Sequence, residues 1–96
     1  MEVLDAQGLK EIGKRIKEGD HEAFHILYRC YFERYARYAL RYTCDVEEAT
    51  DLVQNAFFSL GENRSQYDEN KNVFLYLLII VKNNCINYLR SIKIKD

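Results

Sequence analysis

Apolar residues recur every three or four positions along most of the chain, which is the spacing of one face of a helix. The first such stretch contains Leu9, Ile12 and Ile16 and stops before Gly19. A longer stretch follows Asp20, a residue type that favours helix N-caps. Its apolar positions are Phe24, Leu27, Tyr28, Tyr31, Tyr35, Tyr38, Ala39 and Tyr42. The pattern predicts helices over about residues 7–18 and 20–43.

Two more helices are predicted in the C-terminal half. The segment TCDVEE interrupts the pattern, and Asp45 can cap a third helix over about residues 45–60. Gly61 suits a helix C-terminus, and the polar segment GENRSQYDENKN predicts a loop over residues 61–72. A fourth helix is expected over about residues 73–92. Since no segment has the period-two alternation of a strand, the fold class predicted for residues 1–96 is all-α, a compact single-domain bundle of three to four helices.

Composition narrows the class of protein. The chain has 96 residues, no proline, and 48% hydrophobic residues, enough for one folded core. No stretch reaches the ~20 apolar residues of a membrane span, and the first residues lack a signal pattern. Three cysteines without metal-like spacing predict reduced, mostly buried thiols. We therefore expect a soluble, cytoplasmic protein without a disulfide framework.

Charge is distributed unevenly along the chain. The segment from Asp45 to Asn70 contains seven acidic residues and one base, Arg64. The segment from Lys71 onward contains five bases and one acid, Asp96. Adjacent acidic and basic segments indicate two surfaces with different partners. The alternative is that both are ordinary solvated helix faces.

The third predicted helix has one apolar and one polar face on a helical wheel. Its core side contains Ala49, Leu52, Val53, Ala56, Phe57 and Leu60. The opposite side contains Glu47, Asp51, Gln54, Asn55 and Phe58. An aromatic ring surrounded by a carboxylate and amides is typical of a protein-contact anchor. Alternatively, Phe58 is folded under the following loop.

The fourth predicted helix also has two faces. Its apolar stripe contains Phe74, Leu77, Leu78, Val81, Cys85, Tyr88, Leu89 and Ile92. The other side contains Tyr76, Lys82, Asn83, Asn87, Arg90 and Lys93, with Ile79 and Ile86 pointing roughly the same way. The preceding loop adds Arg64, Gln66, Tyr67 and Lys71. Cations neutralise phosphates, amides read base edges and rings stack on bases, so this face predicts nucleic-acid binding.

The segment HEAFH formally matches the H-E-x-x-H signature of zinc proteases, in which two His bind the metal and the Glu is the general base. A third ligand could come from Glu47 or Asp51. However, the chain is short for a protease, and no strand is predicted to hold a substrate peptide. A simpler interpretation is that Asp20 caps a helix whose first turn contains Glu22, where the helix dipole favours an acid.

Three stretches carry a family resemblance. GDHEAFHILYRCYF is similar to the pattern G-D-x-x-A-F-x-x-L-Y-x-x-Y, and DVEEATDLVQNAFFSL is similar to D-x-x-x-A-x-D-x-V-Q-x-x-F. VFLYLLIIVKNNCINYLR is similar to F-x-x-W-L-x-x-x-A-x-N-x-x-x-x-Y-L-R. In order and spacing, the segment from Glu18 to Lys93 resembles region two of bacterial sigma-70-type RNA polymerase sigma factors, and more narrowly the extracytoplasmic-function (ECF) group.

The resemblance implies a transcription initiation factor that is not an enzyme and needs no cofactor or metal. It implies that Asp51, Gln54, Asn55 and Phe58 bind the coiled coil of the β′ clamp of core RNA polymerase. Tyr67, Asn83 and Asn87 would form a pocket for a base flipped from the non-template strand of the −10 promoter element. Tyr76 would offer a stacking ring, and Lys82, Arg90 and Lys93 would follow the phosphates. An anti-sigma factor is a further partner that the resemblance allows.

The sequence departs from the family pattern at several positions. Tyr76 stands where Trp is frequent, and Ile79, Ile80 and Lys82 stand where Tyr, Arg and Ala are frequent. The sequence contains no counterpart of the family's C-terminal helix-turn-helix domain, region four, so we expect either an excised domain or a truncated product, and weak promoter binding by this domain alone. A helical adaptor that binds only protein is the alternative function, and it would have no need of Asn83, Asn87 and Arg90.

Overall fold

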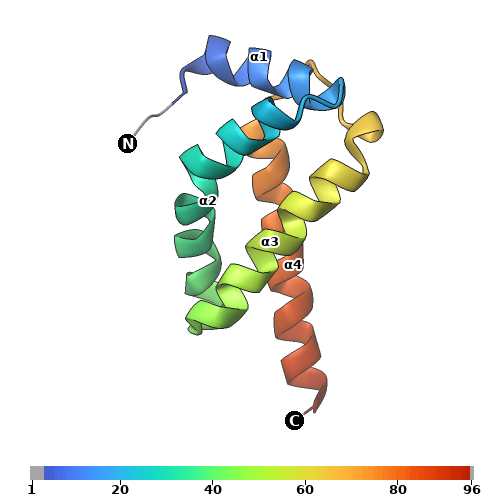
Figure 1. The fold of residues 1–96 in the computed structure, drawn as a ribbon. Coiled ribbons are helices and arrows are strands. Elements are labelled where there is room, and N and C mark those ends of the chain that lie inside the picture. Colours follow the sequence, from blue (N-terminus) through green and yellow to red (C-terminus); the bar gives the residue numbers. More distant parts are fainter. Residues whose placement is uncertain (1–3, 96) are drawn as a thin grey trace.

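The computed structural model describes residues 4–95 and contains four α-helices (Figure 1). These are α1 (Ala6–Lys17), α2 (His21–Thr43), α3 (Val46–Glu62) and α4 (Val73–Lys95), with a short 3₁₀-helix, η1 (Arg64–Gln66), before α4. No strand occurs among these residues. The predicted all-α fold class is therefore confirmed.

Side-chain caps explain where the helices begin. Asp5 accepts a hydrogen bond from the backbone N–H of Gly8 (2.7 Å), and Asp45 accepts from the N–H of Glu47 (2.9 Å). Asp20 accepts from the N–H groups of Glu22 and Ala23 at the start of α2. These contacts satisfy N–H groups of the first turn, which have no partner inside the helix.

Residues in the left-handed region of the backbone follow two of the helices. Gly19 has φ 89°, which ends α1 as the sequence predicts, and Cys44 has φ 54° at the end of α2. The third helix was expected to end near Leu60 and Gly61; α3 ends two residues later, at Glu62, and Asn63 is the capping residue. A difference of this size is ordinary, because helix ends fray and their bounds vary by one or two residues.

Helices α2, α3 and α4 pack against one another, and α1 lies across one end of them (Figure 1). Tyr35 of α2 lies at the centre, where its hydroxyl donates to the main-chain oxygen of Phe74 in α4 (2.8 Å). Its ring centroid lies 5.7 Å from that of Phe57 in α3 and 5.1 Å from that of Phe74. One aromatic cluster thus joins the three helices.

Two expectations about burial were wrong. Leu89 and Ile92 were expected in the core but are exposed, because the last turns of α4 extend past the ends of α2 and α3 (Figure 1). The cysteines were expected to be mostly buried; Cys85 is buried and Cys30 partly so, but Cys44 is exposed, and all three are free thiols. No helix between residues 4 and 95 has the length and apolar character required to cross a membrane.

Candidate protein and nucleic-acid interfaces

The outer face of α3 has the character expected from the sequence. Asp51, Gln54, Asn55 and Phe58 are all exposed on it. Phe58 leaves 68% of its surface accessible, so the alternative that this ring is folded under the following loop is wrong. Between Val46 and Glu62 the helix has acidic residues and no Lys or Arg. The face therefore combines a protruding aromatic ring with a negative, hydrogen-bonding rim.

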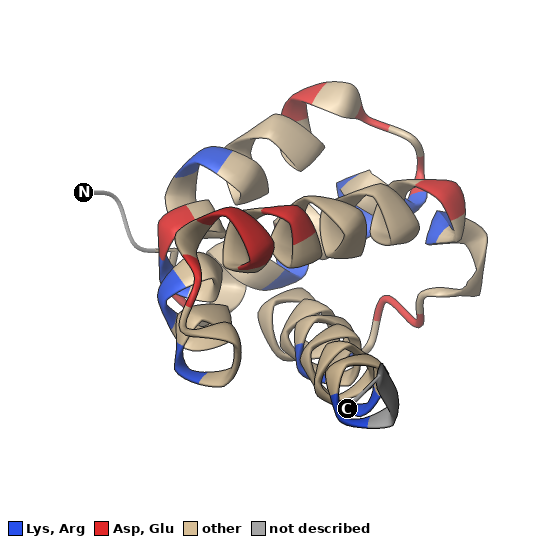
Figure 2. Ribbon diagram, turned by 90° about the horizontal axis from the view of Figure 1, so that it is seen from below, with Lys and Arg blue, Asp and Glu red and all other residues tan. Residues whose placement is uncertain are grey.

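The solvent face of α4 has the opposite charge. Lys82, Asn83, Asn87, Arg90 and Lys93 are all exposed along it. The helix has no Asp or Glu, and Figure 2 shows its basic segments separated from the acidic segments of α3. Cations and amides thus occur together on a surface that no carboxylate of the same helix neutralises.

Tyr76 lies at the flank of this face near the start of α4. It is partly buried, and the ring of Tyr67 packs edge-on against it, with centroids 4.9 Å apart and planes at 65°. Contact with a second ring restricts the movement of Tyr76, and a restricted ring loses less entropy when a base stacks on it.

The structure places Tyr67 differently from the prediction. The sequence suggested a surface ring in a polar loop, but Tyr67 is fully buried, and its hydroxyl donates to the main-chain oxygen of Lys71. A ring without accessible surface cannot stack on a base in this conformation. Tyr67 supports Tyr76 from the protein interior.

The loop between α3 and α4 is held by the end of α1. A guanidinium nitrogen of Arg64 donates to the main-chain oxygen of Lys17 (2.9 Å), and the Lys17 ammonium donates to the main-chain oxygen of Tyr67. The first contact spans 47 positions of the sequence and the second spans 50. Thus α1 fixes the loop that leads into α4, a role that the helical periodicity of α1 could not reveal.

Three residues near the start of α4 and at its contact with α3 were not predicted from the sequence: Asn72, Leu75 and Asn84. Asn72 caps α4, because its Oδ1 accepts from the backbone N–H of Leu75 (3.1 Å). Leu75 is 53% exposed and Ile79 is 59% exposed, so the polar face begins with an apolar patch. Asn84 donates its amide to the main-chain oxygen of Leu52 (3.2 Å) and ties α4 to α3. An Asn followed by apolar residues after a polar loop was the available signal for the cap.

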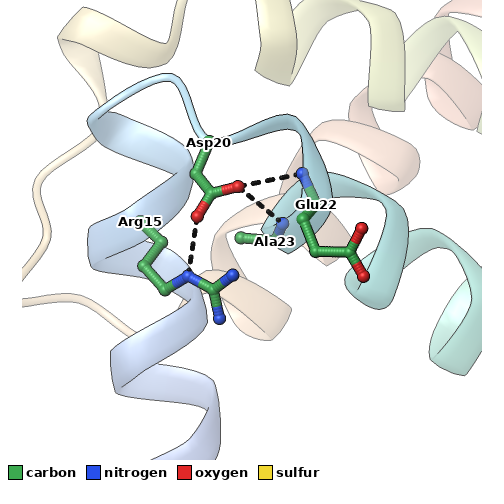
Figure 3. A network of polar contacts seen from close by, with 4 residues as sticks. All are labelled: Arg15, Asp20, Glu22 and Ala23. Atoms are coloured by element: carbon green, nitrogen blue, oxygen red, sulfur yellow. Dashed lines mark hydrogen bonds and ion pairs between the residues drawn. The ribbon is translucent and has the colours of Figure 1, made fainter.

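The HEAFH segment forms the first turn of α2. Oδ1 of Asp20 accepts from the backbone N–H groups of Glu22 (2.9 Å) and Ala23 (3.4 Å), and Oδ2 accepts from Nε of Arg15 (2.9 Å). The Glu22 carboxylate extends away from this network (Figure 3). Among residues 4–95, no three His, Cys, Asp or Glu side chains are gathered closely enough to hold a metal ion. The structure thus gives the zinc alternative no support.

The fold and its two surfaces of opposite charge favour a small helical binding domain. A family profile for sigma-70 region 2 matches residues 27–93. The chain is also 29% identical over 85 residues to the ECF RNA polymerase sigma factor SigW of Bacillus subtilis (strain 168). This alignment covers 88% of the chain and 46% of the relative, so the chain spans about half the length of the curated relative that it matches. No solved structure matches the chain.

Because the profile covers more than half of its residues, the chain belongs to the sigma-70 region 2 family. The two matches support a sigma-factor role in transcription initiation.

Proposed function

We propose that this chain is the domain of an ECF-type sigma factor that binds core RNA polymerase and captures promoter DNA. In this proposal α3 docks on the coiled coil of the β′ clamp, and α4 holds bases of the non-template strand at the −10 element. The observation that carries the proposal is the separation of an acidic face with Phe58 from a basic face with two amides. The catalysis of RNA synthesis belongs to the polymerase, and this chain acts by binding.

The chemistry of α3 supports a protein contact. An exposed aromatic ring inside a polar rim is a common anchor in protein interfaces, and such anchors carry much of the binding energy. The acidic residues around Phe58 predict that the docking surface on the clamp is basic, because complementary charge speeds association and selects partners.

The chemistry of α4 supports base capture. Flipping a base out of the duplex costs a few kcal/mol, which stacking and hydrogen bonds to the base edge must offset. The Tyr76 ring can stack, whereas Asn83 and Asn87 each offer a donor and an acceptor for a base edge. Lys82, Arg90 and Lys93 can neutralise the phosphates of the same strand. Tyr67 takes part as the support of Tyr76.

The test is a fluorescence titration of the chain with a purified β′ clamp fragment and with labelled single strands that contain candidate −10 sequences. Phe58→Ala should weaken clamp binding about tenfold or more, as expected for an anchor. Val46→Ala is the matched control, because Val46 is also 68% exposed on α3 but lies outside the proposed docking face.

The strand titrations separate a promoter reader from a protein-only adaptor. Asn83→Ala and Asn87→Ala should reduce the preference for particular sequences, whereas Lys93→Ala should weaken all strands evenly. Clamp binding without any strand binding would identify an adaptor. Strand binding with no sequence preference in the wild-type chain would disprove the base pocket.

A further inference from the structure

A groove of about 500 Å³ lies at the start of α4, beside the cationic face. It is lined by Lys71, Asn72, Leu75, Tyr76, Ile79 and Ile80. Leu75 and Ile79 are neighbours on the helix at i and i+4, and both side chains are more than half exposed. Packing in the core therefore does not account for apolar residues at these two positions. A groove of this volume with apolar walls and a few polar groups has the character of a ligand site.

The surroundings of the groove favour a strand of nucleic acid as its occupant. Lys71 lines the groove, and Lys82 and Asn83 follow Ile79 by three and four positions on the same exposed face. The groove is therefore continuous with the surface that we assign to DNA, and its cations complement phosphates. Tyr76 adds an aromatic ring to the same wall.

Asn72 gives the groove a defined hydrogen-bonding character. Its Oδ1 faces the backbone N–H of Leu75 (3.1 Å), and a backbone N–H can be satisfied only by an acceptor, so the orientation of the amide is determined. The NH₂ group of Asn72 has no hydrogen-bond partner within residues 4–95. Asn72 thus supplies a hydrogen-bond donor at the rim of an apolar groove.

We propose that this groove selects a thymine base of the captured strand, an inference that rests on the proposed function. Thymine carries a C5-methyl group, which fits the apolar wall of Leu75 and Ile79, and an O4 acceptor, which fits the NH₂ group of Asn72. Cytosine lacks the methyl group and has an N4 donor in place of the O4 acceptor, so its N4–H₂ group would lie against the NH₂ group of Asn72 without forming a hydrogen bond. Tyr76 stacks on the base, and Lys71 contacts the adjacent phosphate.

The inference is tested by titrating the 96-residue chain with labelled oligo-dT, oligo-dU and oligo-dC of equal length at one ionic strength. The three strands have the same phosphates and differ only in their base edges. Oligo-dT should bind about fourfold more tightly than oligo-dU, since one buried methyl group is worth ~0.8 kcal/mol and ~1.4 kcal/mol is tenfold. Oligo-dC should bind more weakly than oligo-dU.

Two variants assign these preferences to the groove. Ile79→Ala should lower oligo-dT affinity more than oligo-dU affinity, so that the preference for oligo-dT is lost, whereas Val46→Ala should leave both affinities unchanged. Asn72→Asp keeps an acceptor for the cap of α4 but replaces the donor, so it should reverse the preference for oligo-dU over oligo-dC. The added charge weakens both strands alike, so the ratio reports the base contact. Circular dichroism spectra of the variants serve as the control that the helices are retained.

The possible outcomes separate the inference from the proposed function. Equal binding of oligo-dT and oligo-dU by the wild-type chain, with a normal salt dependence, overturns the thymine groove but leaves DNA binding by α4 intact. Failure to bind any strand overturns both. If Ile79→Ala leaves every strand titration unchanged but weakens binding to the β′ clamp, the groove is a protein contact and the inference is wrong.

Discussion

Asp20 shows how one side chain organises a helix junction. One carboxylate oxygen caps α2, and the other pairs with Arg15 at the end of α1 (Figure 3). The hydrogen bond from Arg15, followed by those from the backbone of Ala23 and Glu22, lowers the pKa of Asp20 below its ordinary value of 3.8. Because the folded state favours the charged form, this contribution to stability is present above the ordinary pKa and is lost as the pH falls through the folded pKa.

Two substitutions separate the cap from the charge of Asp20. Asp20→Asn keeps a good capping acceptor but removes the ion pair, whereas Asp20→Ala removes both. We expect thermal unfolding at neutral pH to shift slightly downward for Asp20→Asn and further for Asp20→Ala. In both variants the loss of stability on acidification should be smaller than in the wild-type chain. An acid dependence identical to that of the wild type would mean that the charge of Asp20 does not stabilise the fold.

Tyr67 marks the limit of prediction from sequence at the scale of a residue. Its neighbours Gln66, Asp68 and Glu69 are polar, so local composition indicated a surface position. Its burial results from contacts with residues distant in the sequence, because Gly13 and Lys17 of α1 lie against it. Helical periodicity reports which face of one element is apolar, and it carries no information about the partner that covers a loop.

The burial of Tyr67 predicts its behaviour at alkaline pH. Desolvation, with smaller contributions from the charges of Asp68 and Glu69, raises the pKa of Tyr67 from 10.0 to about 12. The folded state therefore favours the neutral phenol, and this stability is present below the ordinary pKa and is lost as the pH rises toward 12. Tyr67→Phe should lose less stability than the wild type over that range, measured by denaturant unfolding. Equal losses would show that Tyr67 does not govern alkaline unfolding.

At the scale of an element, α1 packs closely on the loop through Gly13. A Cβ atom at Gly13 would lie 2.6 Å from the hydroxyl oxygen of Tyr67, which is held by its bond to Lys71. Gly13→Ala should therefore destabilise the fold by about 1–3 kcal/mol, the usual range for overpacking, despite the better helix propensity of Ala.

Gly61 provides the control for that substitution. A Cβ atom there would lie 3.6 Å from the ring of Phe24, an ordinary contact. Since Gly61 lies inside α3, Gly61→Ala should stabilise the fold by up to ~1 kcal/mol through helix propensity. Urea unfolding of both variants measures the two effects. Stabilisation by both would show that α1 can move away from the loop without cost.

The helices could be predicted better than their ends. Two aspartate caps, Asp20 and Asp45, indicated the start of α2 and α3 within one or two residues, and the spacing of apolar residues did the same for α1. The exposure of Leu89 and Ile92 could not be predicted in the same way, because it depends on α4 being longer than the helices that pack on it. Likewise, the outer faces of α3 and α4 followed from the helical wheel, whereas the groove beside Asn72 depends on how the loop enters α4.

At the scale of the whole molecule, the two proposed interfaces differ in charge, so changes of charge on α3 and on α4 should affect different partners. Exposed Lys82, Arg90 and Lys93 lie on α4, and each phosphate contact to a single strand contributes about 0.7 to the slope of log affinity against log salt concentration. We therefore expect these three residues together to contribute about −2 to the slope of the wild-type chain, and each Lys→Ala or Arg→Ala change among them should reduce the magnitude of the slope by about 0.7.

The matched control for the salt series is Arg37→Ala, since Arg37 is already paired with Glu33 on α2 (2.7 Å). It should leave the slope for single strands unchanged. Asp51→Asn on α3 should weaken clamp binding and leave the slope for single strands unchanged, because Asp51 belongs to the acidic face. Titrations over a range of salt concentrations, with strand and with clamp fragment, measure both responses. If Asp51→Asn changed the strand slope as much as Lys93→Ala, the two faces would form one electrostatic surface, and the division of roles between α3 and α4 would be wrong.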